Sequence, residues 1–66
     1  MQVWLNDQPI PCLAGIALSQ LLAQLSQPVS GVALAVNDRI VPQNQWANYL
    51  LQDNDRILLF QTIAGG

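Results

Sequence analysis

The fold of this chain is decided by Leu18-Ser19-Gln20-Leu21-Leu22-Ala23-Gln24-Leu25, in which leucines recur at positions 18, 21, 22 and 25. This i, i+3, i+4, i+7 spacing places the leucines on one side of an α-helix, while polar residues fill most of the other faces. Ala17 occupies the expected N-cap without a side-chain acceptor, although Gln20 suits the far end of a capping box. The apolar stripe needs a second layer to pack against, and the flanking segments supply it.

Two strands are predicted before the helix. The first six residues alternate, with Val3 and Leu5 on one face and Trp4 on the other, which is the period of a half-buried strand. A polar turn follows, and residues 8–12 then contain Pro9 and Pro11, which have no N–H to donate to a sheet ladder. Prolines two positions apart face the same way, so both can point outward from a strand at the edge of the sheet.

Further strands are predicted after the helix. Residues 32–36 form a short apolar run, and residues 56–63 form a longer run rich in β-branched and aromatic side chains. Residues 40–41 can pair briefly before Pro42 stops them. The segment 43–51 is too irregular for more than a short helical turn.

Three side chains of that segment, Trp46, Tyr49 and Leu50, are expected to pack under the sheet. Residues 53–55 (Asp-Asn-Asp) indicate a tight turn in which Asn54 tolerates a left-handed backbone. The element order therefore predicts an α+β fold, a mixed four- to five-stranded sheet packed on one main helix.

Length and composition limit the functions that the chain can have. Sixty-six residues form a single domain, residues 1–66. A net charge of −2, with two arginines and no lysine, argues against nucleic acid and anionic membranes as partners. We expect a cytoplasmic protein, because no apolar run approaches the ~20 residues of a membrane span and the first residues lack the basic start of a secretory signal. We also expect the chain to be a monomer when free. Cys12 alone cannot form an internal disulfide, and without histidine no metal site is expected.

The sequence ends on Ala64-Gly65-Gly66, directly after the final predicted strand. Glycines without Cβ atoms leave the terminal carboxylate unhindered, and chain ends are usually mobile. We therefore expect a globular body at residues 1–63 and a flexible tail at residues 64–66, with the Gly66 carboxylate as a chemical handle.

Taken together, these segments resemble the ThiS family of ubiquitin-like β-grasp sulfur carriers over all 66 residues. Besides the helix and the Ile63-Ala64-Gly65-Gly66 end, the likeness is carried by Asn6-Asp7-Gln8, Ala33-Leu34-Ala35-Val36-Asn37, Ile40-Val41-Pro42, Gln45-Trp46, Gln52-Asp53-Asn54-Asp55 and Ile57-Leu58-Leu59-Phe60-Gln61. A double-glycine end is shared across the β-grasp carriers and modifiers. The short length together with the Ile-Val-Pro and Gln-Trp segments narrows the resemblance to the ThiS family. Asn54 departs from a frequent glycine and Ala17 from a usual hydroxyl cap, and neither departure touches the chemistry.

The resemblance implies that the chain is a protein co-substrate and not an enzyme. A ThiF-like adenylyltransferase would use ATP and Mg²⁺ to convert the Gly66 carboxylate to an acyl-adenylate, while the chain itself would bind no cofactor. A persulfide sulfur, supplied indirectly by a donor such as a cysteine desulfurase, would displace AMP and leave a thiocarboxylate. A ThiG-like thiazole synthase would receive the sulfur for the thiazole ring of thiamine, and Gly65 would give the tail clearance in a narrow channel.

Docking is expected on the sheet face opposite the helix. The β-grasp pattern turns Ile57 and Leu59 inward, which leaves Leu58 and Phe60 exposed beside Trp4 if the first and last strands are neighbours. With 9% charged and 52% apolar residues, exposed apolar surface suggests a protein partner. The expected partner contacts are Trp4, Leu58, Phe60, Ile63 and Ala64. The alternative is that the three large side chains are core residues beneath the segment 43–51.

Other side chains have plainer interpretations. Cys12 lacks a nearby basic group in the sequence and is expected to be a small buried residue, not a sulfur-transfer thiol. Asp53 and Asp55 are expected in a solvated turn, not as an acid–base pair or as metal ligands. Arg39 and Arg56 either contact the rim of a partner or only solubilise the protein.

Three other functions stay open. The small subunit of molybdopterin synthase uses the same tail chemistry, although such chains are usually longer. A ubiquitin-like protein modifier would pass Gly66 to lysines of target proteins. A non-covalent β-grasp interaction module would carry its two glycines by chance.

Overall fold

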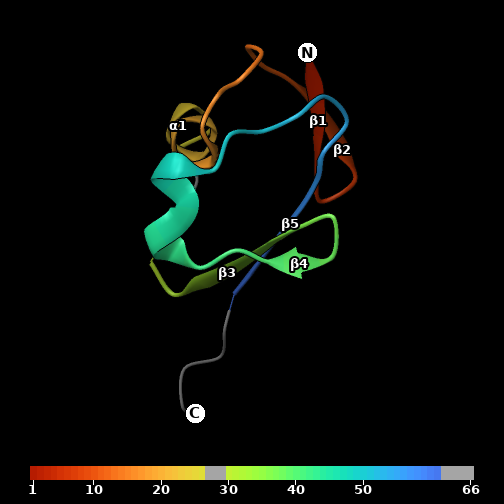
Figure 1. Cartoon of the computed structure of the whole chain (residues 1–66). Helices are drawn as coiled ribbons and strands as arrows, with labels where there is room; N and C mark the ends of the chain where they lie inside the picture. The colour runs from red at the N-terminus through yellow and green to blue at the C-terminus, as the bar shows by residue number, and fades with distance from the viewer. Residues whose placement is uncertain (27–29, 62–66) are drawn as a thin grey trace.

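A computed structural model describes residues 1–26 and 30–61 of the chain (Figure 1). The elements, in chain order, are β1 (Gln2–Leu5), β2 (Gln8–Pro11), α1 (Leu18–Gln24), β3 (Val32–Val36), β4 (Arg39–Ile40), the 3₁₀ helix η1 (Gln43–Asn48) and β5 (Arg56–Gln61). Each predicted strand, the helix and the short helical turn are present. The fold is α+β, as the sequence predicts.

The five strands form one mixed sheet in the order β2-β1-β5-β3-β4. The last strand, β5, lies at its centre, parallel to β1 and antiparallel to β3. The Trp4 N–H donates to the Asp55 carbonyl at 2.8 Å, and the Asn6 N–H donates to the Ile57 carbonyl at 2.9 Å. The first and last strands are therefore neighbours, which is the condition that the expected docking face requires.

Strand β2 forms one edge of the sheet, and both of its prolines face away from β1. Met1 and Cys12 exchange two main-chain hydrogen bonds, each 2.8 Å long. Hydrogen-bonded and non-hydrogen-bonded pairs alternate along an antiparallel ladder. The main-chain groups of Ile10 therefore also point toward β1, whereas the nitrogens of Pro9 and Pro11 point outward, where no donor is needed. The predicted edge strand is confirmed.

Both two-residue hairpins are closed by the same dipeptide, Asn-Asp. In the β1–β2 turn the φ angles are 48° at Asn6 and 68° at Asp7, and in the β3–β4 turn they are 52° at Asn37 and 71° at Asp38. Positive φ at both central residues is the type I′ geometry, whose twist matches that of the strands. Asn54 adopts a φ of 70° before β5, which confirms its expected left-handed conformation.

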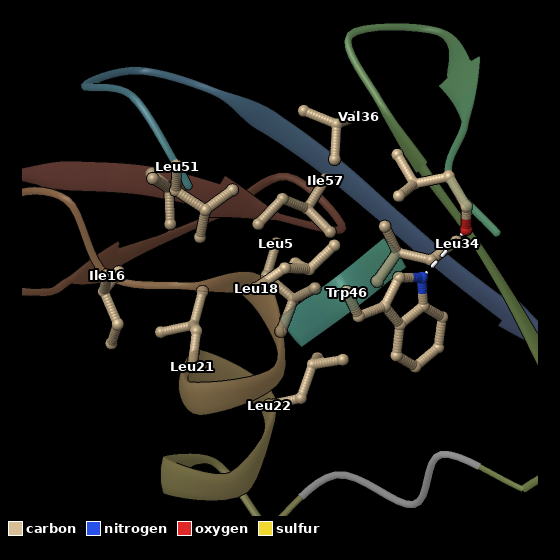
Figure 2. Packing of buried hydrophobic residues seen from close by; sticks show 12 residues of the cluster. Leu5, Ile16, Leu18, Leu21, Leu22, Leu34, Val36, Trp46, Leu51 and Ile57 are labelled. Carbon is tan, nitrogen blue, oxygen red and sulfur yellow. Dashed lines mark hydrogen bonds between the residues drawn. The ribbon is translucent and has the colours of Figure 1, made fainter. Parts of the chain in front are cut away.

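The core lies on the face of the sheet that α1 and η1 cover (Figures 1 and 2). The predicted leucine stripe is confirmed, since Leu18, Leu21 and Leu22 are at most 1% exposed and Leu25 packs half-buried against them. The stripe meets inward-facing strand and loop residues: Val3, Leu5, Ile16, Leu34, Val36, Val41, Leu51 and Ile57. At the start of α1 the Gln20 Oε1 accepts from the Ala17 N–H at 3.1 Å, which is the expected half of a capping box.

Trp46 of η1 closes the core beneath β3, as Figure 2 shows. The indole Nε1 donates to the Val41 carbonyl at 2.8 Å, so the only polar atom of this buried side chain has a partner. Trp46 is buried and Tyr49 is half-buried against the core, in agreement with the sequence.

Leu50 is exposed, so its expected place under the sheet is wrong. It forms an isolated antiparallel bridge with Ala17, and the next N–H, that of Leu51, donates to the Ile16 carbonyl at 2.9 Å. Successive side chains of an extended backbone alternate in direction. The bridge therefore turns Leu51 into the core and Leu50 away from it.

Residues 27–29 and 62–66 lie outside the described residues. The expected tail at 64–66, the boundary of the globular body at residue 63 and the last two residues of the predicted final strand all fall there. Within residues 1–26 and 30–61, no helix has the length and apolar character that crossing a membrane would require.

A pair of leucine substitutions measures how far stability depends on this core. Leu22→Ala removes a side chain that is fully buried, whereas Leu13→Ala removes one that is 73% exposed. We expect L22A to lower the free energy of unfolding by about 2–5 kcal/mol and L13A to change it by less than about 0.5 kcal/mol, because only the first leaves a cavity. Equilibrium urea unfolding measures both, and equal losses would contradict the assigned core.

Candidate functional site

The outer face of the sheet, opposite α1 and η1, carries large side chains of the strand that leads to the tail. Along β5, Ile57 is buried and Leu59 is half-buried against the core. Leu58 and Phe60 point the other way and are each 45% exposed. The predicted alternation of this strand is confirmed.

Neighbouring strands extend this apolar surface. Trp4 of β1 is half-buried and lies opposite Arg56, so it shares the outer face of β5. On the other side Leu58 lies opposite Ala35, and Ala35 lies opposite Ile40 of β4, which is 63% exposed. We refer to the following four residues as the outer patch: Trp4, Ile40, Leu58 and Phe60.

Leu58 and Phe60 are exposed because the side chains beside them on β3 are small. Phe60 lies opposite Ala33 and Leu58 lies opposite Ala35, so methyl groups neighbour the two larger side chains across the β3–β5 ladder. Ile40 was not among the residues predicted for this surface. The signal was present, because a two-residue turn at Asn37-Asp38 fixes Ile40 opposite Ala35.

A hollow of about 100 Å³ opens on the outer face, lined by Trp4, Asp7, Asp38, Arg56, Ile57 and Leu58. It is smaller than the roughly 300–1,000 Å³ of sites that enclose small molecules. Apolar side chains beside charged ones are the usual arrangement at protein–protein interfaces, with an apolar centre and a polar rim. The hollow is therefore smaller than a typical small-molecule site, and its lining has the mixed character of an interface.

The alternative placement of the three large side chains in a core beneath residues 43–51 is wrong. Trp46 of η1 is only 3% exposed and packs with Leu34 and Ile57, which belong to the inner face. The segment thus covers the opposite side of the sheet from Leu58 and Phe60.

The start of β5 is anchored by a buried carboxylate. Asp55 is 7% exposed and accepts hydrogen bonds from the Gln52 N–H at 2.8 Å and from Asn37 Nδ2 at 2.9 Å. Asn37 Oδ1 in turn accepts from the Arg56 N–H at 3.1 Å. The prediction of a solvated carboxylate is therefore wrong for Asp55, and its hydrogen-bond partners compensate for its burial. The same prediction is confirmed for Asp53, which is exposed.

The remaining candidates are placed as follows. Cys12 is a free, half-buried thiol that packs against the core, and Arg39 and Arg56 are exposed. Among residues 1–26 and 30–61, no three or more His, Cys, Asp or Glu side chains come together in a way that could hold a metal ion. Gln61 is the last described residue, and the predicted site residues Ile63, Ala64, Gly65 and Gly66 lie outside the described part.

Comparison with known proteins gives related sequences along the whole chain. The sulfur carrier protein ThiS of Escherichia coli (strain K12) is 54% identical over 66 residues, and the match covers 100% of both chains. A protein of Pyropia yezoensis, uncharacterized protein ycf40, is 27% identical over 100% of this chain and 93% of its own length.

Solved structures share the fold. The crystal structure of the thiamine biosynthesis protein ThiS from Geobacter metallireducens matches with a TM-score of 0.87 over 100% of both chains, at 17% identity. An NMR structure of a thiamine biosynthesis protein from the same organism matches with a TM-score of 0.73 over 88% of its length. The ThiS family model matches residues 3–66, nearly the whole chain. With this match and the end-to-end identity to the E. coli protein, the chain belongs to the ThiS family.

Proposed function

We propose that this protein is a sulfur carrier of thiamine biosynthesis whose C-terminal Gly66 carboxylate is converted to a thiocarboxylate. The identity of 54% to the sulfur carrier protein ThiS of E. coli, over the full length of both chains, carries the proposal. The geometry supports it, because the strand that leads toward Gly66 lies at the centre of the sheet and presents Leu58 and Phe60 outward.

The proposed chemistry starts from an unreactive group. A carboxylate repels nucleophiles and has a poor leaving group, so a ThiF-like adenylyltransferase joins it to the α-phosphate of ATP with release of pyrophosphate. Mg²⁺ in that enzyme neutralises phosphate charge. A persulfide sulfur then attacks the acyl carbon and AMP leaves. Cleavage of the sulfur–sulfur bond by a second thiol, which becomes oxidised to a disulfide, leaves the thiocarboxylate.

The two glycines suit the tail to this task. Gly65 and Gly66 have no Cβ, so they can adopt φ values closed to other residues and can follow a narrow channel without shielding the reacting carbonyl. Ile63 and Ala64 precede them and are proposed to contact the wall of that channel. The catalytic groups belong to the partners, and this chain acts as their protein co-substrate.

The outer patch is proposed as the docking surface for the adenylyltransferase and for a ThiG-like thiazole synthase. Trp4, Leu58 and Phe60 supply large apolar side chains, and aromatic residues are enriched at the energetic centres of interfaces. Asp7, Asp38 and Arg56 add charge beside the hollow, where complementary charges on a partner favour encounter and register.

Substitution of the terminal residue tests the tail. Gly66→Val is expected to reduce thiocarboxylate formation by about a hundredfold or more, because a branched side chain displaces the carboxylate in the adenylation site. The protein is incubated with ATP, Mg²⁺, the adenylating enzyme and a sulfur donor, and intact-mass analysis detects replacement of one oxygen by one sulfur. An unchanged mass for the wild type would refute the carrier function, and a covalent protein adduct would indicate a modifier.

Substitution in the outer patch tests docking. Phe60→Ala is expected to raise the KM of the adenylating enzyme for this protein roughly 5- to 30-fold, which corresponds to about 1–2 kcal/mol for an aromatic interface residue. Leu50→Ala is the matched control, because it removes an exposed apolar side chain that is not in the outer patch. Adenylation of F60A at the wild-type rate in a normally folded protein would rule out this docking surface.

Deletion of the gene separates the two carrier pathways. Loss of the protein is expected to cause a growth requirement that thiazole relieves, because the thiazole ring would lack its sulfur. Growth that requires molybdopterin instead of thiazole would assign the chain to molybdopterin synthase. Growth without either supplement would leave a protein modifier or a non-covalent interaction module as the explanation.

A further inference from the structure

The side chain of Asn6 continues the β1–β5 ladder beyond the end of β1. Strand β1 stops at Leu5, whereas β5 runs on to Gln61. Asn6 Oδ1 accepts from the Leu59 N–H at 2.9 Å, and Asn6 Nδ2 donates to the Leu59 carbonyl at 3.2 Å. The Asn6 N–H also donates to the Ile57 carbonyl at 2.9 Å. One residue thus holds β5 by three hydrogen bonds, and we refer to its two side-chain bonds as the amide clamp.

Asparagine meets both requirements of this position. The φ of 48° at Asn6 lies in the left-handed region, which asparagine tolerates better than most residues other than glycine. Its amide carries a donor and an acceptor, so it can replace a peptide group of the missing strand. Aspartate keeps an acceptor but has no donor when ionised, and glycine keeps the backbone conformation but has no side chain.

The clamp lies near the end of the described part of β5. Leu59 is two residues before Gln61, and among the described residues its two bonds to Asn6 are the tie on the β1 side that is nearest to the C-terminus. Leu58 and Phe60, on either side of Leu59, belong to the outer patch. The amide clamp therefore holds both the strand that leads to Gly66 and the side chains proposed to meet the partner.

A second asparagine provides an internal comparison at the other end of β5. Asn37 occupies the same position of the same type of turn, with a φ of 52°. Its side chain accepts from the Arg56 N–H and donates to Asp55. Asn37 thus fixes the first residue of β5, at the end remote from the tail, whereas Asn6 fixes its later part.

We propose that Asn6 is a positioning residue for docking: by pairing with the Leu59 backbone on its β1 side, while β3 pairs along the other side, it keeps Leu58 and Phe60 in the geometry relative to Trp4 that the adenylating enzyme binds. This inference rests on the proposed function. Opening of the clamp would leave only a fraction of the chains in the binding geometry, and the apparent dissociation constant would rise by the inverse of that fraction. The rate of the bound complex would not change.

The test compares Asn6→Gly with Asn37→Gly. Glycine keeps positive φ at no steric cost, so each variant removes a side-chain amide from the same turn position. We expect N6G to speed hydrogen exchange of the Leu59 amide and to raise the KM for adenylation about tenfold, with kcat within about twofold of wild type. N37G also loses a bond to the buried Asp55, so it should lower the melting temperature at least as much while raising that KM less than N6G does.

Each outcome decides the matter. Equal rises in KM for both variants would show a general effect of stability and overturn the positioning role. A wild-type KM for N6G, in a protein whose Leu59 amide exchanges faster, would also overturn it, because the clamp would then be open without any effect on binding. If N6G does not fold, Asn6→Asp replaces it, because this variant keeps the acceptor and loses only the donor; a wild-type KM for N6D overturns the proposal. A wild-type protein that is not adenylated at all refutes the proposed function itself, which these variants distinguish from a failed clamp.

Discussion

The parallel pairing of β1 with β5 is the interaction on which the rest of this structure depends. It joins the two ends of the described chain, since Asn6 and Leu59 are 53 positions apart and yet bonded. It also places β5 at the centre of the sheet, where one side chain in two points to α1 and the next points to the outer face. Without this pairing Trp4 would have no fixed relation to Leu58 and Phe60, and the tail would leave from an edge strand.

The two faces of β5 serve different needs. Ile57 and Leu59 pack on the helix layer and supply stability, which in so short a chain must come from a small number of buried side chains. Leu58 and Phe60 lie outside that core and are exposed, which makes them available for the proposed docking. If the outer patch is the docking surface, this separation lets a partner bind without disturbing the side chains that hold the fold together.

The sequence predicted those features that depend on local pattern. Alternation assigned the faces of β1 and β5, the spacing of leucines located α1, and Pro9 with Pro11 marked an edge. Several features that depend on contacts between distant segments were missed or wrong. Asp55 is buried because Asn37 reaches it from another turn, and Leu50 is exposed because a bridge to Ala17 sets its direction. Ile40 joins the outer patch through the register of β3 and β4, which the Asn37-Asp38 turn sets but which was not used to place Ile40.

The central position of the last strand also determines when the sheet can form during synthesis. The β1–β2 and β3–β4 hairpins are local and can close early, but in the described sheet, of order β2-β1-β5-β3-β4, it is β5 that joins them. Pairings between distant segments carry a large loop-closure entropy and form slowly. The two hairpins can therefore be joined into one sheet only after β5 has been synthesised. A nascent chain therefore cannot present an assembled outer patch before β5 exists, so the proposed docking surface is completed only late in synthesis.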